Sequence, residues 1–219
     1  MKDLTEKIIM IFGKPGSGKT TVLAAAACAS LTGHYFLGIR PHSRVYTTFA
    51  CPGCYQLEPA AIGVYDFTDS LLIIDEASQF FDARDWAKFQ AHQRTWFQLH
   101  RHCRASVIMC SQGYSDCDLR IRNLCQEFYL LQPLPFHFSV IKPIKAFINL
   151  DNNTIQEGYQ FSAPIQWKLI YRKRYYPLFN SFAQYVDYLP NEAELYPGNN
   201  YLVDKKISKK KISLLKRPA

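Results

Sequence analysis

The chain has 219 residues, of which 48% are hydrophobic and 20% are charged, and this composition excludes an intrinsically disordered protein. Its length accommodates one core domain of ordinary size with a small appended unit and argues against two full-sized domains. The net charge of +8 is concentrated at the C-terminus, where the lysines and arginines after position 204 have no acidic neighbour. The rest of the chain is therefore nearly neutral.

The N-terminus reaches an apolar segment by Ile8 without the pattern of a signal peptide, so we expect a cytoplasmic protein. Contact with the inner face of the membrane would be peripheral. The longest candidate for a spanning helix is Val22–Leu31, which is short and rich in alanine, whereas a span needs about 18 apolar residues. Seven cysteines in such a chain indicate reduced thiols and no disulfide framework.

The first predicted strand is Lys7–Phe12, a nearly continuous apolar run that is typical of a parallel strand buried on both faces. The next element is a helix over Thr20–Ala29, whose alanines allow close packing on a sheet and which ends before Gly33. Two further strands are predicted at Arg44–Phe49 and Leu71–Ile74.

Apolar residues at helical spacing predict an amphipathic helix over Asp82–Cys103, at Trp86, Phe89, Trp96, Leu99 and Cys103. It is followed by a fourth strand at Ala105–Cys110, a short polar helix near Asp118–Leu124 and a fifth strand at Glu127–Leu131. Strands that alternate with helices predict an α/β fold with a parallel sheet and right-handed crossovers. We assign this core to residues 1–132.

The pattern changes after Pro133, and residues 133–203 are predicted to form a small module rich in β-hairpins. Its strand-like runs are Phe136–Ile141, Ala146–Leu150 and Tyr159–Phe161, around a turn at Asp151–Asn153. Residues 204–219 are expected to form a flexible basic tail. Its lysines and aliphatic residues suit an anionic membrane surface, with nucleic acid or a merely solvated end as the alternatives.

The loop after the first strand matches the phosphate-loop pattern G-x-x-x-x-G-K-[ST] and lies where that motif requires, between a strand and a helix. Its backbone N–H groups would point at phosphate oxygens, helped by the dipole of the helix. Lys19 is expected to reach the β- and γ-phosphates, and Thr20 to bind Mg²⁺. The predicted residues for binding ATP are Gly13, Lys14, Pro15, Gly16, Ser17, Gly18, Lys19, Thr20 and Thr21.

Two adjacent acids, Asp75 and Glu76, follow the apolar run Leu71–Ile74 and should therefore emerge at the carboxyl edge of the sheet. Successive side chains of a strand diverge, so the two acids are expected to differ in role. We predict that Asp75 holds Mg²⁺, directly or through water, and that Glu76 is the general base that polarises the attacking water.

Several other side chains are candidates for the catalytic site. Gln112 follows the fourth strand and could orient water or sense phosphate, with a helix-capping role as the alternative. Arg101, Arg120 and Arg122 are candidates for an arginine that reaches the ATP of a neighbouring subunit, although for any one of them a solvated or structural charge is the favoured interpretation. Cys51 and Cys54 form a C-x-x-C pair, but no second pair follows that would complete a zinc site.

Taken together, these segments resemble the N-terminal domain of the zonular occludens toxin (Zot) family, the ATPase domain of filamentous-phage (inovirus) assembly proteins. The resemblance covers about Lys7–Phe182. The similarity is found mainly in the phosphate loop and in the segments Arg44–Thr48, Leu72–Ala77, His100–His102, Ser111–Gln112 and Asp118–Arg122.

The resemblance implies a P-loop fold of the additional-strand type, in which the fourth strand lies between the phosphate-loop strand and the acid-bearing strand. Gln112 would then face the γ-phosphate. It also implies a homo-oligomeric motor that couples ATP hydrolysis to virion assembly and DNA extrusion at the host inner membrane. Its partners would be phage DNA or virion components and envelope assembly proteins.

Longer members of the family continue into a membrane-spanning helix and an outer domain to which the toxin activity is attributed. The sequence lacks that part, and we therefore predict no toxin activity. A nucleotide-dependent conformational switch or scaffold with little turnover is the alternative to the motor. A small-molecule kinase is a third possibility, but the pair of acids and the lack of an arginine-rich lid favour water as the phosphate acceptor.

Overall fold

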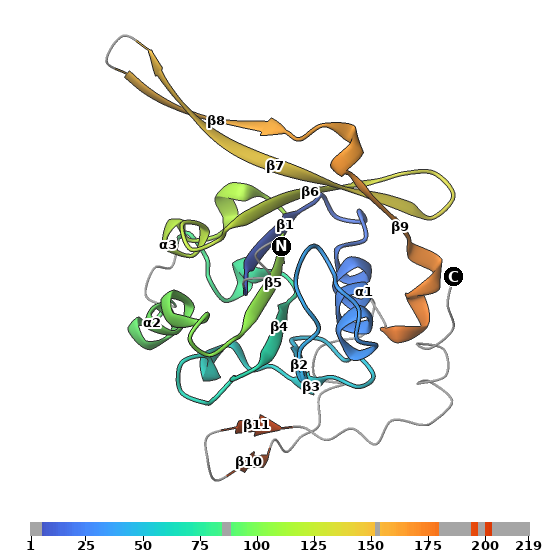
Figure 1. Cartoon of the computed structure of the whole chain (residues 1–219), viewed down its shortest axis with the longest axis vertical. Coiled ribbons are helices and arrows are strands. Elements are labelled where there is room, and N and C mark those ends of the chain that lie inside the picture. Colours follow the sequence, from blue (N-terminus) through green and yellow to red (C-terminus); the bar gives the residue numbers. More distant parts are fainter. Residues whose placement is uncertain (1–5, 85–88, 152–153, 180–193, 197–199, 203–219) are drawn as a thin grey trace.

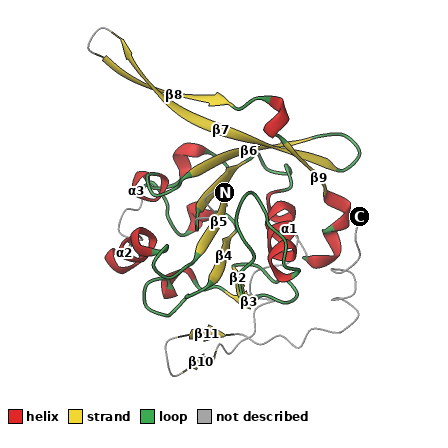
Figure 2. Ribbon diagram, in the orientation of Figure 1, coloured by secondary structure: helices red, strands yellow, loops and turns green. Residues whose placement is uncertain are grey.

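The computed structural model describes residues 6–84, 89–151, 154–179, 194–196 and 200–202. A nine-stranded sheet runs through the molecule, with helices on both of its faces (Figure 1, Figure 2). The strand order is β3-β2-β4-β5-β1-β6-β7-β8, and β9 also pairs with β7. The mixed α/β class that the sequence predicts is therefore confirmed.

The first six strands of this order are parallel, as predicted from the alternation of strands and helices. Their observed bounds are β1 Ile8–Phe12, β2 Arg44–Thr47, β3 Tyr55–Gln56, β4 Ser70–Ile74, β5 Ser106–Ser111 and β6 Glu127–Pro133. The strand β5 lies between β1 and β4, which confirms the additional-strand order. This order brings the ends of the phosphate-loop strand, the acid-bearing strand and β5 to one edge of the sheet.

Two layers of core follow from the alternation of side chains along the parallel strands. On β1, Ile8, Met10 and Phe12 face one layer, while Ile9 and Ile11 face the other. The helix α1, Lys19–Leu31, covers the second layer with its alanines, as its sequence predicts. The helices α2, Ala91–Leu99, and α3, Leu119–Arg122, cover the first layer.

The amphipathic helix is shorter than the predicted range Asp82–Cys103. Asp82 pairs instead with Cys117 in an isolated bridge, and residues 85–88 lie outside the described part of the chain. The helix begins at Ala91 because Gln90 and Gln93 form a reciprocal capping box. The helix ends at Leu99, and the chain reaches β5 through a turn in which Arg104 has a left-handed conformation, with a φ of 51°.

The strands after Pro133 extend the main sheet in the antiparallel direction. They are β7 Phe138–Asp151, β8 Thr154–Phe161 and β9 Lys168–Tyr171, and the β7–β8 hairpin projects from the body (Figure 1). The two predicted runs on either side of Lys142–Lys145 belong to one strand. Pro143 is tolerated there because it falls between the part of β7 that pairs with β9 and the part that pairs with β8.

Short 3₁₀ helices connect the strands at η1 Pro59–Ala61, η2 Ala77–Gln79, η3 Tyr114–Asp116, η4 Pro164–Gln166, η5 Arg172–Arg174 and η6 Tyr176–Leu178. A separate antiparallel pair is formed by β10 Glu194–Tyr196 and β11 Asn200–Leu202. The predicted basic tail lies outside the described residues. Among the helices of the described ranges, none is long and apolar enough to cross a membrane.

A buried histidine gives the fold a testable dependence on pH. The Nε2 atom of His42 lies 3.1 Å from Ser106 Oγ, and its Nδ1 atom lies 3.7 Å from an oxygen of Asp69. Burial, together with the positive charge of Arg40, lowers the pKa of His42 from 6.5 to about 4. The unfolded chain therefore binds a proton between these two pH values while the folded chain does not.

We expect this difference to reduce the free energy of unfolding as the pH falls from about 6.5 to about 4, by about 3 kcal/mol at most. Replacing His42 with glutamine should flatten the profile in this window, as measured by chemical denaturation at a series of pH values. His102, which is exposed, provides the matched control substitution. Parallel pH profiles for the wild type and the His42→Gln variant would contradict the assignment.

Candidate functional site

The loop between β1 and α1 has the conformation of a phosphate loop. Gly16 and Gly18 have φ values of 76° and 94°, a left-handed region in which a side chain is strained. The backbone N–H of Gly13 donates to the carbonyl of Ser111 at 3.2 Å, which fixes the start of the loop to the end of β5. Lys14, Pro15 and Gly16 are exposed at its tip.

At the end of the loop, the two predicted magnesium ligands are in contact. Thr20 Oγ1 donates to Asp75 Oδ2 at 2.6 Å, and the backbone N–H of Asp75 donates to Thr48 Oγ1. Burial raises the pKa of Asp75, and the hydrogen bond from Thr20 opposes this shift. Lys19 Nζ donates to the carbonyl of Gly13 at 2.9 Å. Thr21 is buried, which leaves its backbone as the part that could meet a nucleotide.

These residues fit a magnesium ion bound together with a nucleotide. A hydroxyl and a carboxylate are the oxygen ligands that Mg²⁺ prefers, and the ion usually takes the remainder from phosphates and water. The buried carboxylate of Asp75 would gain from a cation, because burial disfavours its charged form. The described residues contain no group of three or more His, Cys, Asp and Glu side chains placed to hold a metal by themselves.

The second acid takes a different direction, as the sequence predicts. Glu76 adopts a left-handed conformation with φ 52°, at the start of η2. One of its carboxylate oxygens accepts a hydrogen bond from Ser78 Oγ at 2.7 Å, and the other accepts one from Gln112 Nε2 at 3.3 Å. The structure thus brings Glu76 and Gln112 together beside the phosphate loop.

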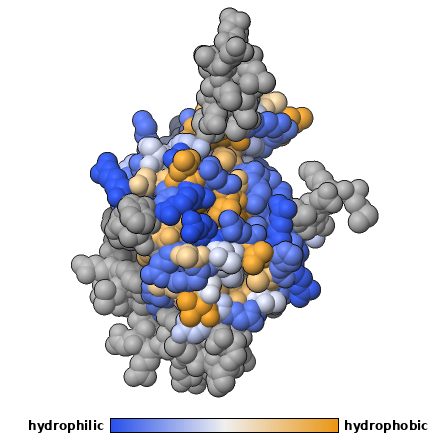
Figure 3. Space-filling view, turned by 90° about the vertical axis from the view of Figure 1, so that its left-hand side faces the viewer, coloured by the Kyte–Doolittle hydropathy of each residue, from blue (hydrophilic) through white to orange (hydrophobic). Residues whose placement is uncertain are grey.

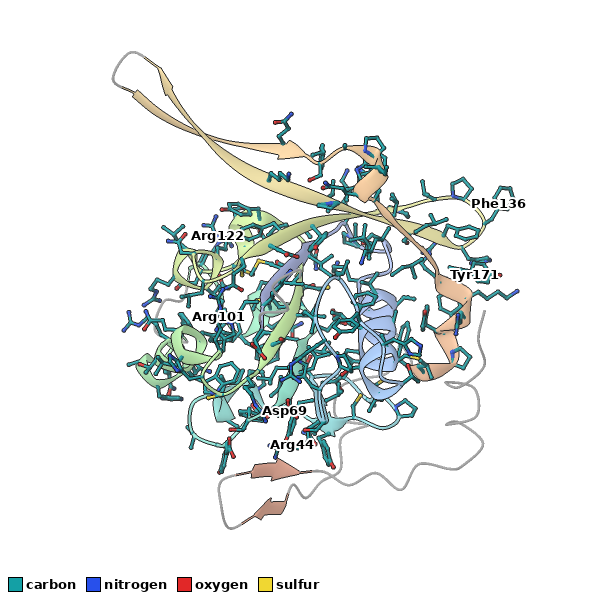
Figure 4. All side chains as sticks on the ribbon, in the orientation of Figure 1. Arg44, Asp69, Arg101, Arg122, Phe136 and Tyr171 are labelled. Atoms are coloured by element: carbon teal, nitrogen blue, oxygen red, sulfur yellow. The ribbon has the colours of Figure 1, made fainter. Side chains whose placement is uncertain are left out.

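The three candidate arginines lie on the face of the sheet covered by α2 and α3, where Figure 4 labels Arg101 and Arg122. Arg120 forms an ion pair with Asp118, and Arg122 donates to the carbonyl of Cys117 and lies over the ring of Tyr114. Arg101 is exposed, and its side chain forms no hydrogen bond or ion pair within the described residues, while its backbone carbonyl accepts from the N–H of Arg104. Arg101 precedes β5 and lies near the amino end of that strand, whereas the phosphate loop contacts its carboxyl end. Arg101 and the phosphate loop of the same chain are therefore at opposite ends of β5.

Sequence reasoning missed two contacts to the phosphate loop from the C-terminal strands. Ser139 Oγ donates to the carbonyl of Ser17 at 2.8 Å, and Arg172 Nη1 donates to the carbonyl of Gly16 at 3.3 Å. In the sequence, Ser139 is 122 positions from Ser17, and Arg172 is 156 positions from Gly16. The basic run Arg172–Arg174 after a short strand is the sequence signal that could have drawn attention to them.

The C-x-x-C pair lies in the core, away from these groups. Cys51 and Cys54 are both buried in the layer beneath α1. Hydrogen bonding to Cys51 and burial raise the pKa of Cys54. A buried Cys54 held in the thiol form in this way is suited to packing rather than to nucleophilic chemistry.

The strand order and the phosphate loop define the protein as a member of the P-loop NTPase fold class, of the additional-strand type. Within this class the chain belongs to the zonular occludens toxin (Zot) family, whose model matches residues 53–184. The matched part begins after the phosphate loop and contains both acids and Gln112. Comparison with curated protein sequences gives no significant match.

Two solved structures illustrate the similarity of the fold. The N-terminal domain of zonular occludens toxin from Neisseria meningitidis is 20% identical, with a TM-score of 0.48, and the alignment covers 80% of this chain and 100% of that one. The genome packaging NTPase B204 from Sulfolobus turreted icosahedral virus 2, in complex with ATP-gammaS, is 14% identical, with a TM-score of 0.43 and coverage of 69% and 96%.

Proposed function

We propose that this protein binds ATP with Mg²⁺ and hydrolyses it. The observation that carries the proposal is the convergence of three groups at one edge of the sheet. These groups are the phosphate loop, the contact between Thr20 and Asp75, and the contact between Glu76 and Gln112. They supply the phosphate cradle, the metal ligands and the water-activating groups that phosphoryl transfer to water requires.

Each residue has a distinct part in the proposed reaction. The loop and Lys19 bind the phosphates and offset their charge, while Thr20 and Asp75 would hold Mg²⁺, which neutralises charge on the phosphate oxygens. Glu76 accepts a proton from the attacking water, and Gln112 orients that water and the carboxylate. The assay that tests the proposal is the steady-state release of phosphate from ATP by the purified protein.

The finer proposal is an oligomeric motor of filamentous-phage assembly that extrudes phage DNA at the host inner membrane. Membership of the Zot family supports it, because the resemblance to that family implies a motor of filamentous-phage assembly. The side with α2 and α3 carries exposed apolar residues among hydrophilic ones (Figure 3), including Leu99 and Leu119, which are about half exposed. We propose that this side contacts the neighbouring subunit and presents Arg101 to its ATP.

An arginine that acts between subunits has a specific kinetic signature. We expect Arg101→Ala and Lys19→Ala proteins to be inactive alone and to regain activity when mixed. In mixed oligomers, the ATP of an Arg101→Ala subunit would meet the intact Arg101 of a Lys19→Ala neighbour. With random mixing in equal amounts, roughly a quarter of the sites would be complete. Phosphate release by the separate and mixed proteins is the measurement.

The control for this experiment is Arg104→Ala, because Arg104 is exposed in the same turn as Arg101. It should keep wild-type turnover. Activity per chain should also rise with the concentration of the wild-type protein as oligomers form. A monomer with turnover independent of concentration would remove Arg101 from the mechanism.

A switch with little turnover is the second candidate function. It is favoured by the hydrogen bonds to Glu76, since both carboxylate oxygens already accept from side chains of the same chain. A carboxylate held in this way could sense the nucleotide without activating water. Tight ATP binding with negligible phosphate release at every protein concentration would favour the switch over the motor.

A further inference from the structure

The phosphate loop is held from outside by the C-terminal part of the sheet. Ser139 comes from β7 and Arg172 from the start of η5, immediately after β9. These two strands are neighbours, since Phe138 pairs with Tyr171 and Ser139 with Ile170. Figure 4 labels Tyr171 on the side of α1, away from Arg101 and Arg122. Ser139 and Arg172 therefore contact the loop from one pair of hydrogen-bonded strands, and we call these two residues the support of the loop.

The packing at this support is tight. A Cβ atom added to Gly18 would lie 2.7 Å from Cδ of Arg172 and 3.3 Å from Oγ of Ser139. The aliphatic stem of Arg172 thus covers the backbone of the loop. Its Nε atom is buried and, among the described residues, has no hydrogen-bond partner. Arg172 is half-buried, and its stem and Nε atom are held against the loop while Nη1 bonds the carbonyl of Gly16.

The atoms that accept these hydrogen bonds show what the support does. In a phosphate loop the backbone N–H groups face the phosphates, and the carbonyls of the same peptide units point away from them. Arg172 and Ser139 bind the carbonyls of Gly16 and Ser17, which are successive residues of the loop. They therefore fix the orientation of the peptide groups without occupying the place of the phosphates.

From these contacts we propose that Arg172, assisted by Ser139, is a positioning residue of the nucleotide site. It holds the phosphate loop in the conformation that binds phosphate. Gly16 and Gly18 make the loop conformationally free in the absence of such a support, and fixing their backbone costs conformational entropy. The inference rests on the proposed function, because it assigns Arg172 to the site that binds ATP.

The support also links the nucleotide to a distant part of the molecule. The strand that carries Ser139 continues through Asp151 into the projecting hairpin with β8 (Figure 1). A change in the loop that breaks or strengthens these two hydrogen bonds would act directly on β7 and β9. Hydrogen exchange of residues 168–173 should accordingly slow when ATP binds.

The test compares Arg172→Gln, Ser139→Ala and Arg172→Lys in the full chain, with Lys173→Gln as a control because Lys173 is exposed next to Arg172. We expect Arg172→Gln to raise the Kd of ATP about tenfold, equivalent to about 1.4 kcal/mol. Ser139→Ala should raise it less, and Arg172→Lys should restore part of the affinity. Lys173→Gln should leave it unchanged. The Kd is measured by titration at equilibrium, beside the unfolding midpoint without nucleotide.

The outcomes separate the two proposals. If the wild type binds ATP while Arg172→Gln and Ser139→Ala bind it equally well, the positioning role is refuted and the proposed function stands. If the wild type does not bind ATP, both proposals are refuted. Should Arg172→Gln fail to fold, Ser139→Ala decides by the same titration. A purely structural Arg172 would lower the unfolding midpoint without changing the Kd of the folded variant, which would also overturn the inference.

Discussion

Replacing Lys19 with alanine is expected to weaken ATP binding by roughly 100-fold, because a charge-assisted contact to phosphate contributes about 3 kcal/mol. The fold should be preserved. The ammonium group of Lys19 donates to the carbonyl of Gly13 at the half-buried loop and fills no part of either core layer. Titration with ATP and denaturation of the nucleotide-free protein would measure the two effects separately.

Lys145→Ala is the matched control for this substitution. Lys145 is an exposed residue of β7, and its removal takes away the same charge at a site remote from the loop. This variant should keep the wild-type affinity for ATP. A folded Lys19→Ala protein that binds and hydrolyses ATP normally would refute the assignment of the loop.

The parallel core could be predicted because each of its signals is local. The apolar runs of β1, β4 and β5 are bounded by glycine or polar residues, and the loop motif occurs between a strand and a helix. The position of β5 between β1 and β4 is a long-range property. The resemblance to the Zot family implied it, whereas the periodicity of the sequence could not.

The errors of prediction have particular physical causes. The helix that begins at Ala91 was extended back to Asp82 because the apolar spacing continues there, whereas Asp82 bridges to Cys117 across the chain. The two runs predicted within β7 end at Ile141 and resume at Ala146, yet the strand continues through Pro143, which lies where neither β8 nor β9 pairs with it. In both cases a tertiary partner decides the local structure.

In the candidate site, too, the residues with a local sequence signal could be predicted, and those placed by long-range contacts could not. Different roles for Asp75 and Glu76 are predicted from their adjacent positions at the end of a strand, and in the structure Asp75 contacts Thr20 while Glu76 contacts Gln112. For Arg172 the sequence offers only a basic run and no motif, because its contact with the loop joins a side chain to a backbone carbonyl 156 positions away. Hydrogen bonds to carbonyls place no constraint on the residue type of the acceptor and leave no motif in the sequence.

The substitution Glu76→Gln separates catalysis from binding. We expect ATP to remain bound, since the phosphate loop, Thr20 and Asp75 are unchanged. Hydrolysis should slow by about 10²- to 10⁴-fold, the usual contribution of a general base. Glutamine retains an oxygen that can accept from Ser78 or Gln112, so that the local conformation should persist. Single-turnover hydrolysis and equilibrium binding of ATP are the two measurements.

The control is Glu58→Gln, an exposed carboxylate at which the same change should have no effect on either measurement. The two quantities distinguish the possible roles of Glu76. Loss of ATP binding in the folded variant would make Glu76 a residue that holds the metal or the loop. Unchanged hydrolysis would show that the two hydrogen bonds only fix the turn at η2. Retained binding with slowed hydrolysis is expected only if the carboxylate, released from Ser78 or Gln112, takes the proton from water.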